Sequence, residues 1–301
     1  MGTVTGELRH DALTDEWVAI GGSRQGRPNL PAADCPFCVG GLEAPEPYEA
    51  RAFPNRWPMF SPGAPVALDA AAGSVPARGA SEVVLYSPDH DASLASLGVA
   101  GVRRVVDLWA ERTEALLARA EIEYVLVFEN RGDEAGATIS HPHGQIYAFP
   151  FVPPAPAREA AVAAASGCPV CRQVRDESAD ARRVVLRTHR WIAYVPYASG
   201  WPYGTLLAPE AHVPGLPELD DPGRDGLAAA LVDLLGRYDR LFDRSFPYML
   251  WLHPGVHLHV HVAPPLRSSA AMRFVAAGEL GSGLLTNPVE PEAAAAALRD
   301  A

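Results

Sequence analysis

Residues 141–145 read His-Pro-His-Gly-Gln, and residues 257–261 read His-Leu-His-Val-His. Residues i and i+2 of an extended strand point to the same side. His141 and His143 should therefore share one face of a strand, and His257, His259 and His261 should share one face of another. The side chains between the histidines of the second stretch are apolar and are free to face a core.

Other landmarks recur around these two stretches in the same order. This ordered repetition indicates a duplicated unit, with a first half at residues 1–155 and a second half at 156–301. The Pro- and Ala-rich stretch Pro150–Ala165 is the expected linker. The paired landmarks are Cys35-Pro-Phe-Cys38 with Cys168-Pro-Val-Cys171, Trp57-Pro58 with Trp201-Pro202, and Leu85 to His90 with Leu207 to His212.

Each half contains one long stretch with helical periodicity, followed by a strand-like segment. The strand-like segments are Glu123 to Asn130 and Tyr248 to Val262. We expect an α+β fold made of two antiparallel sheets, each with helices packed on one face. The helical stripes expected to be buried are Val102, Val105, Val106, Trp109, Leu116 and Leu117 in the first half, and Leu227, Leu231, Leu234, Leu235, Tyr238, Leu241 and Phe242 in the second.

Composition excludes several classes of function. The chain has 301 residues, 48% of them hydrophobic, and a formal charge of −11, which argues against a nucleic-acid partner bound through bulk electrostatics. The sequence contains no lysine, so neither a Schiff base nor a Walker-type lysine is available. Its apolar runs are too short to span a membrane, and its polar N-terminal stretch lacks a secretory signal. We expect a cytoplasmic protein.

Two Cys-x-x-Cys pairs in a cytoplasmic chain with four cysteines favour metal binding over disulfides. A closed zinc site needs four ligands, commonly two cysteines from a tight turn and two distant histidines. Cys35 and Cys38 supply the turn of the first half, and His90 and His141 stand at repeated landmarks. The alternative is that these cysteines are small core residues.

If His141 binds zinc, His143 is the candidate nucleophile. A neutral imidazole can attack an activated phosphate and form a covalent nucleotidyl intermediate. Neutral donors to the phosphate oxygens could come from the Gln145 amide and from the hydroxyls of Thr138 or Ser140, and Gly144 would let the backbone approach the phosphate. The alternative is that both histidines serve only as metal ligands.

These residues resemble the active-site signature of the galactose-1-phosphate uridylyltransferase family in the histidine-triad superfamily. The resemblance includes Phe128-Glu-Asn130-Arg-Gly132 and Gly136-Ala-Thr138 before the histidines, and Ser87-Pro-Asp-His90. It extends along nearly the whole chain. It implies a ping-pong transfer in which His143 attacks UDP-glucose and galactose 1-phosphate then takes the uridylyl group.

The resemblance also implies roles for residues outside the His-Pro-His motif. Family members are usually homodimers that complete each site from the partner subunit, and Gln145 separates the transferases from the hydrolases. The implied substrate-binding residues are Asn130 and Thr138 at the phosphate, Arg24, Arg27 and Asn55 at the nucleotide and sugar phosphate, and Glu279 with Arg273 and Phe274 at the hexose.

The second half departs from the best-known members, which hold a different metal there with a glutamate and three histidines. By the logic of the repeat, Cys168 and Cys171 should pair with His212 and His257 in a second zinc site, as in a sub-branch that includes ADP-glucose phosphorylases. The competitors for the fourth position are His253, His259 and His261. We interpret His259 and His261 as packed structural histidines and the second half as scaffold and partner surface.

Three functions remain open at this point. The first is a nucleotidylyltransferase acting on a nucleotide sugar and a hexose 1-phosphate, and the second is an ADP-glucose or other nucleotide-sugar phosphorylase with the same chemistry. The third is a zinc-structured nucleotide-sugar binding protein without turnover. A hydrolase is the weakest reading, because Gln145 lacks a protonatable ring.

Overall fold

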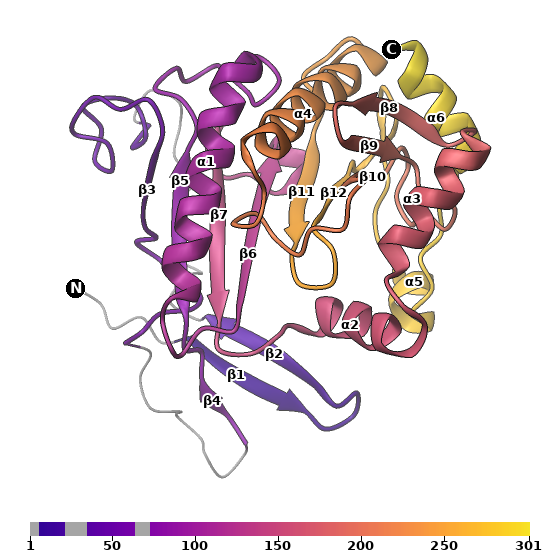
Figure 1. The fold of residues 1–301 in the computed structure, drawn as a ribbon. Coiled ribbons are helices and arrows are strands. Elements are labelled where there is room, and N and C mark those ends of the chain that lie inside the picture. The colour runs from indigo at the N-terminus through magenta and orange to yellow at the C-terminus, as the bar shows by residue number, and fades with distance from the viewer. Residues whose placement is uncertain (1–5, 22–34, 64–72) are drawn as a thin grey trace.

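A nine-stranded antiparallel sheet forms the centre of the protein in the computed structural model, which describes residues 6–21, 35–63 and 73–301 (Figure 1). Its strand order is β3-β5-β7-β6-β11-β12-β10-β9-β8. The strands are β3 (Arg51–Pro54), β5 (Ala80–Leu85), β6 (Tyr124–Arg131), β7 (His143–Phe149), β8 (Val184–Thr188), β9 (Trp191–Tyr194), β10 (Thr205–Pro209), β11 (Tyr248–His253) and β12 (His259–Ala263).

The two halves meet where β6 pairs with β11, with Phe128 opposite Trp251. The two antiparallel sheets expected from the sequence are thus one continuous sheet, and the α+β class is confirmed. The single strand-like segment expected from Tyr248 to Val262 is two strands, because a turn through Gly255, with φ +112°, separates β11 from β12. Only a glycine adopts that backbone conformation without strain.

Two long helices, α1 (Gly98–Leu117) and α4 (Asp221–Leu241), lie side by side on one face of the sheet (Figure 1). Most residues of the predicted stripes are buried, and Trp109 and Tyr238 have no exposed surface. Leu241 and Phe242, at the end of α4, are half-buried, and Leu117, the last residue of α1, is 42% exposed. Both helices pack into one hydrophobic core that is shared by the two halves.

The expected linker is largely a helix. Its alanines favour helix, and Pro154 occupies the first helical position, where a missing N–H costs nothing. The boundary expected between residues 155 and 156 falls inside this helix. The remaining helices are α2 (Pro154–Ser166), α3 (Pro169–Asp180), the short 3-10 turn η4 (Asp133–Ala135), α5 (Ala277–Ser282) and α6 (Pro291–Asp300).

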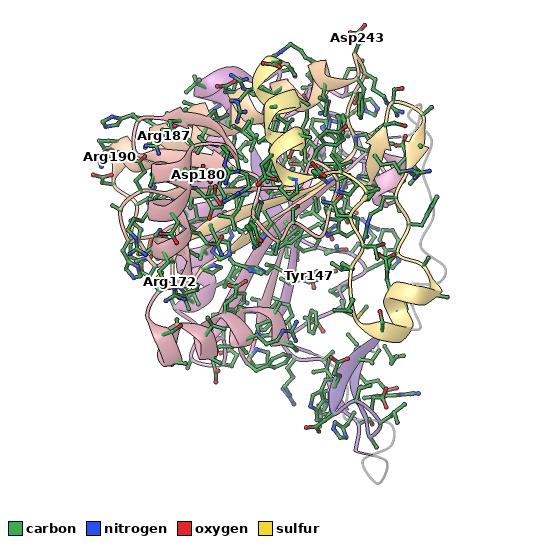
Figure 2. All side chains as sticks on the ribbon, turned by 90° about the vertical axis from the view of Figure 1, so that its right-hand side faces the viewer. Tyr147, Arg172, Asp180, Arg187, Arg190 and Asp243 are labelled. Atoms are coloured by element: carbon green, nitrogen blue, oxygen red, sulfur yellow. The ribbon has the colours of Figure 1, made fainter. Side chains whose placement is uncertain are left out.

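Two small sheets flank the main one. β1 (Gly6–Asp11), β2 (Glu16–Gly21) and β4 (Val75–Pro76) form a projecting three-stranded sheet, and β13 (Leu266–Ser268) pairs with β14 (Ala271–Met272). Charged side chains such as Arg187 and Arg190 lie at the periphery of the second half (Figure 2). Among the described residues, we find no helix with the length and apolarity needed to span a membrane.

Candidate active site and metal centres

The first Cys-x-x-Cys pair lies beside two histidines. Cys38 Sγ is 3.4 Å from His90 Nδ1 and 3.7 Å from His141 Nδ1, and Cys35 completes the group. A tetrahedral zinc ion, with Zn–S about 2.3 Å and Zn–N about 2.0 Å, would set its sulfur and nitrogen ligands about 3.5 Å apart. The four residues expected from the sequence therefore fit a zinc ion.

The orientation of His141 is fixed on the side away from the cysteines. Its Nε2 lies 2.8 Å from the carbonyl oxygen of Ser87 and 2.9 Å from the hydroxyl of Tyr48. Tyr48 Oη also lies 2.7 Å from the carbonyl oxygen of Phe37, so it connects the cysteine turn to the histidine. An Nε2–H bond of this kind leaves the Nδ1 lone pair for a metal. No sequence pattern singles out Tyr48.

His143 begins β7 and is buried, with its ring 5.1 Å from the ring of Phe37. Its Nδ1 lies 2.7 Å from the carbonyl oxygen of His141. A carbonyl can only accept, so Nδ1 carries the proton and Nε2 carries the lone pair. His143 is thus held in the tautomer that a nucleophilic imidazole requires.

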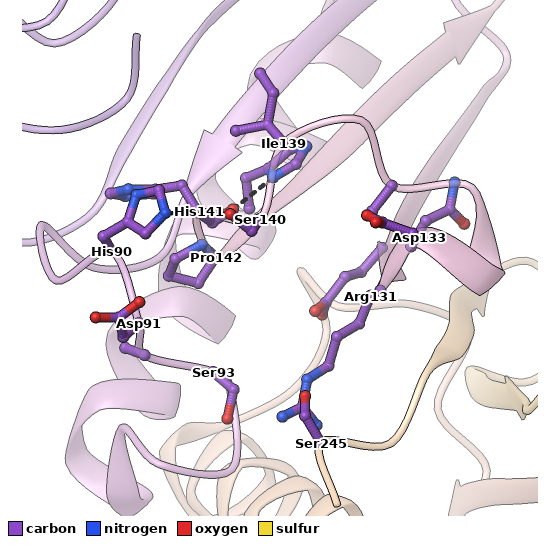
Figure 3. Close-up of a pocket in the computed structure, with 16 residues that line it drawn as sticks. His90, Asp91, Ser93, Arg131, Asp133, Ile139, Ser140, His141, Pro142 and Ser245 are labelled. Carbon is purple, nitrogen blue, oxygen red and sulfur yellow. Dashed lines mark hydrogen bonds between the residues drawn. The ribbon is translucent and has the colours of Figure 1, made fainter. Parts of the chain in front are cut away.

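His143 stands between two pockets. One is a cavity of about 230 Å³ between the halves, which also contains Asn130, Ser140 and Ser245 (Figure 3). The other, smaller pocket is lined by Phe53, Asn55, Trp57 and Gln145 among others. A single imidazole therefore borders both an apolar, ring-lined pocket and a polar one.

The polar residues expected near the phosphate differ in position. Asn55 Nδ2 lies 3.5 Å from Gln145 Oε1 in the smaller pocket, and Asn130 lines the larger one. The Ser140 hydroxyl lies 3.1 Å from His90 Nε2, which is the side of that ring away from the cysteines (Figure 3). Thr138 lies in the same loop as Ser140 but outside the pocket lining.

Gly144 faces the core, where Tyr86 leaves no room for a side chain at this position. A Cβ atom on Gly144 would lie 2.0 Å from the hydroxyl oxygen of Tyr86, a buried residue packed against Trp109. His143 and Gln145 point to the opposite face of the strand. The sequence suggested that Gly144 gives a phosphate access to the backbone; the structure shows that it makes room for Tyr86.

The second Cys-x-x-Cys pair forms a similar group. Cys171 Sγ lies 3.3 Å from the Nδ1 atoms of both His212 and His257, and Cys168 Sγ lies 3.6 Å from that of His257. Burial lowers the pKa of His257 to about 4, which favours the neutral, metal-binding imidazole. The expected second set, including His257 as the fourth residue, is brought together.

Sequence reasoning missed a third group, made of Glu159 and three histidines. Glu159 Oε1 lies 2.8 Å from His253 Nδ1, its Oε2 lies 3.7 Å from His259 Nε2, and His261 completes the group. A carboxylate and three imidazoles suit zinc or iron. The sequence led us to interpret His259 and His261 as packed structural histidines; the structure brings both together with Glu159 and His253 in a group that could hold a metal ion. The missing signal was Glu159, which α2 carries.

The residues expected at the hexose lie elsewhere in this single chain. Arg273 pairs with Glu279 and lies 4.3 Å above the ring of Trp201, and Phe274 is 70% exposed. None of the three lines either pocket beside His143. Arg24 and Arg27 lie outside the described residues.

Comparisons with known proteins agree with this geometry. The family models for the N-terminal and C-terminal domains of galactose-1-phosphate uridyl transferase match residues 7–153 and 164–300. A galactose-1-phosphate uridylyltransferase from Thermotoga maritima is 36% identical, over 98% of both chains.

Solved structures give the same result. The chain resembles a structure of a uridylyltransferase with a TM-score of 0.89 and 30% identity, over 98% of this chain and 97% of that one. An ADP-glucose phosphorylase from Arabidopsis thaliana gives a TM-score of 0.75 and 25% identity, over 99% of both chains. The chain belongs to the galactose-1-phosphate uridylyltransferase family.

Proposed function

We propose that this protein is a nucleotidylyltransferase that moves UMP between hexose 1-phosphates, with UDP-glucose as donor and galactose 1-phosphate as acceptor. One observation carries the proposal: the 2.7 Å contact between His143 Nδ1 and the His141 carbonyl, which puts the lone pair on Nε2 beside two pockets. The full-length likeness to uridylyltransferases supports the choice of substrate.

The reaction has two displacements at the same phosphorus. Nε2 of His143 attacks the α-phosphorus of UDP-glucose, an N–P bond forms, and the P–O bond to glucose 1-phosphate breaks. A phosphate oxygen of galactose 1-phosphate then attacks the same phosphorus and the N–P bond breaks. The Gln145 amide donates to a non-bridging oxygen but has no proton to lend to a leaving group. This limits hydrolysis of the intermediate.

The metal groups have a structural role in this proposal. Zinc held by Cys35, Cys38, His90 and His141 would fix the loop before β7 and orient the His141 carbonyl that binds His143. A second zinc held by Cys168, Cys171, His212 and His257 would do the same in the other half. The reduced cysteines that zinc requires fit the cytoplasmic location expected from the sequence.

A homodimer would explain why the hexose residues lie away from His143. The segment around α5 exposes Phe274, Leu280 and Leu284, which are 70%, 75% and 72% exposed. We propose that this segment enters the site of a partner subunit. Mixing His143→Ala subunits with Phe274→Ala subunits should restore part of the activity, because one hybrid site is intact. Two inactive variants that stay inactive after mixing would contradict this arrangement.

A phosphorylase acting on ADP-glucose is the second candidate. It would use inorganic phosphate in place of the hexose 1-phosphate in the second displacement. The second Cys-His group and the likeness to an ADP-glucose phosphorylase support it.

Trapping the covalent intermediate tests both candidates. The protein is incubated with UDP-glucose or ADP-glucose labelled in the α-phosphate, quenched in base and assayed for acid-labile label on the protein. We expect label from UDP-glucose in the wild type and in the exposed His189→Ala control, and none in His143→Ala. Galactose 1-phosphate should discharge the label.

Each other outcome rejects a specific statement. Label from ADP-glucose that phosphate discharges would favour the phosphorylase. Turnover without label would reject the covalent route. Tight binding of UDP-glucose with neither label nor turnover would indicate a binding protein.

A further inference from the structure

Three buried polar atoms lie close to one another on the core side of β7, the face opposite His143 and Gln145. They are Trp109 Nε1 on α1, the Tyr86 hydroxyl after β5, and Glu129 Oε2 on β6, and none has a well-formed hydrogen bond within the described part of the chain. Buried polar atoms are rarely left unpaired. The Trp109 Nε1–H group is a donor, the Tyr86 hydroxyl can both accept and donate, and the Glu129 carboxyl group can accept, so the three can form one network in that order.

Glu129 is the acceptor at the end of this network. Its Oε1 lies 3.1 Å from the hydroxyl of Tyr248, which donates to it, and its carboxyl group also neighbours Tyr86. Complete burial raises the pKa of Glu129 to about 8. A carboxyl oxygen can accept a hydrogen bond from the Tyr86 hydroxyl whether or not the carboxyl group is protonated.

The other charge near Glu129 does not offset this burial. Arg131 lies on the same strand and acts to lower the pKa of Glu129. Its guanidinium is held by Asp239 of α4 at 2.8 Å and lies 5.6 Å above the ring of Tyr248. Arg131 thus pairs with Asp239, and burial still outweighs its effect on the pKa of Glu129.

Tyr86 connects Glu129 to the strand that carries His143. Its hydroxyl occupies the space next to Gly144, and its backbone N–H donates to the carbonyl of Pro142 at 3.2 Å. Pro142 and Gly144 flank His143 in the sequence. The position of the Tyr86 ring therefore decides where β7 places His143.

The second half lacks this network. The repeat makes Phe128 of β6 equivalent to Trp251 of β11, which lies opposite it. The residues that follow, Glu129 and Leu252, are therefore equivalent. Gly144 and Val260 are equivalent in the same way, because each follows the second histidine of its motif. Leu252 and Val260 are both buried in the apolar core. The strand geometry alone therefore requires neither the glutamate nor the glycine.

We propose that Glu129 is a positioning residue for the transfer reaction, which holds Tyr86 against Gly144 and thereby fixes the strand that carries His143. This inference rests on the proposed function. Nothing in it requires Glu129 to touch the substrate.

Four variants test the proposal in the metal-loaded full-length protein. Glu129→Gln keeps a neutral group that can donate and accept, whereas Glu129→Leu copies the second half. Tyr86→Phe removes only the hydroxyl. Tyr238→Phe is the matched control, because it removes the hydroxyl of another fully buried tyrosine, whose hydrogen-bond partners are Thr205 and Tyr203 of the second half.

We expect Glu129→Leu and Tyr86→Phe to lower kcat and the rate of adduct formation by the same factor, between about 10-fold and 10²-fold, since small displacements of a reacting group cost rates of that order. KM for UDP-glucose should change less than about twofold, because the pocket contacts remain. Glu129→Gln should restore kcat to near the wild-type value, and Tyr238→Phe should leave it unchanged.

The proposal is overturned by an unchanged kcat in Tyr86→Phe or Glu129→Leu, or by a Glu129→Gln variant as slow as Glu129→Leu. An equal loss in Tyr238→Phe would also overturn it, since the effect would then be general loosening of the core. If Glu129→Leu does not fold, the Tyr86→Phe and Tyr238→Phe pair decides. A wild type that forms no adduct rejects the proposed function instead.

Discussion

The same local geometry surrounds two histidines to which we assign different roles. His143 Nδ1 lies 2.7 Å from the carbonyl of His141, and His259 Nδ1 lies 2.7 Å from the carbonyl of His257. What differs is the group near Nε2. Glu159 Oε2 stands 3.7 Å from His259 Nε2, where it repels the phosphate that a nucleophile must approach. The surroundings, and not the motif, decide which half can react.

Variants at Gly144 and Tyr86 test whether it is Tyr86 or a bound phosphate that requires a glycine at position 144. Gly144→Ala should lower kcat by about 10²-fold, because the new methyl group would collide with Tyr86 and displace β7. Adding Tyr86→Leu removes both the hydroxyl and the ring carbon that bears it. Relative to Tyr86→Leu alone, the further change Gly144→Ala should therefore lower kcat by less than about 10-fold. Steady-state kinetics on the three variants check this.

An alternative reason for Gly144 predicts another result. If a phosphate had to approach the backbone at this residue, replacing Tyr86 would not relieve the substitution. A loss of kcat from Gly144→Ala that is as large in Tyr86→Leu as in the wild type would therefore restore the expectation drawn from the sequence.

Tyr48 should contribute to metal affinity without binding the metal. Tyr48→Phe removes the hydroxyl that lies 2.9 Å from His141 Nε2. We expect the first zinc to be bound about 10-fold to 10²-fold more weakly, as is typical when a partner of a ligating histidine is lost. Competition with a chromophoric chelator measures both zinc sites at once. The second site serves as internal control, and equal weakening of both sites would contradict the prediction.

At the scale of elements, α2 shows what a sequence cannot reveal. Glu159 is an ordinary acidic residue in an alanine-rich stretch. Only the packing of α2 below β11 and β12 brings its carboxylate to His253 and His259. The two Cys-x-x-Cys groups could be predicted because each turn supplies two ligands from one short stretch. The Glu159 group draws its ligands from three separate elements.

Cys168→Ser tests whether the metal groups are independent. The variant should lose one zinc per chain, because serine is a poor zinc ligand at neutral pH. His143 lies in the other half, so the protein should still form the adduct at a lower thermal stability. Elemental analysis and a thermal melt give the two values. An unchanged metal count would show that Cys168 holds no metal.

At the scale of the whole molecule, the duplication could be predicted and its assembly could not. Alternating side chains and ordered landmarks specify the strands, and the stripes of α1 and α4 specify their buried faces. The sequence did not indicate that β6 pairs with β11, because nothing in either strand distinguishes an edge strand from a central one. Leu117 was wrongly predicted to be buried, because periodicity does not show how well the last turn of a helix is covered.

The change of the free energy of unfolding with pH should report the protonation of Glu129. The folded protein holds this proton until about pH 8, whereas the unfolded chain releases it near the ordinary value of 4.5. Between those values the folded state binds more protons, so the free energy of unfolding falls as pH rises. Glu129→Gln does not titrate. Urea unfolding at pH 5, 6.5 and 8 should therefore show the wild type losing stability relative to this variant, and a constant difference would contradict the assignment.

The junction of β6 and β11 has a consequence for expressing the protein in pieces. A fragment ending before α2 would present β6 as an unprotected edge, and its remainder would present β11 in the same state. Each piece alone should self-associate or precipitate. Produced together, they should associate into an active two-chain enzyme, because β6 of one piece can form its backbone hydrogen bonds with β11 of the other.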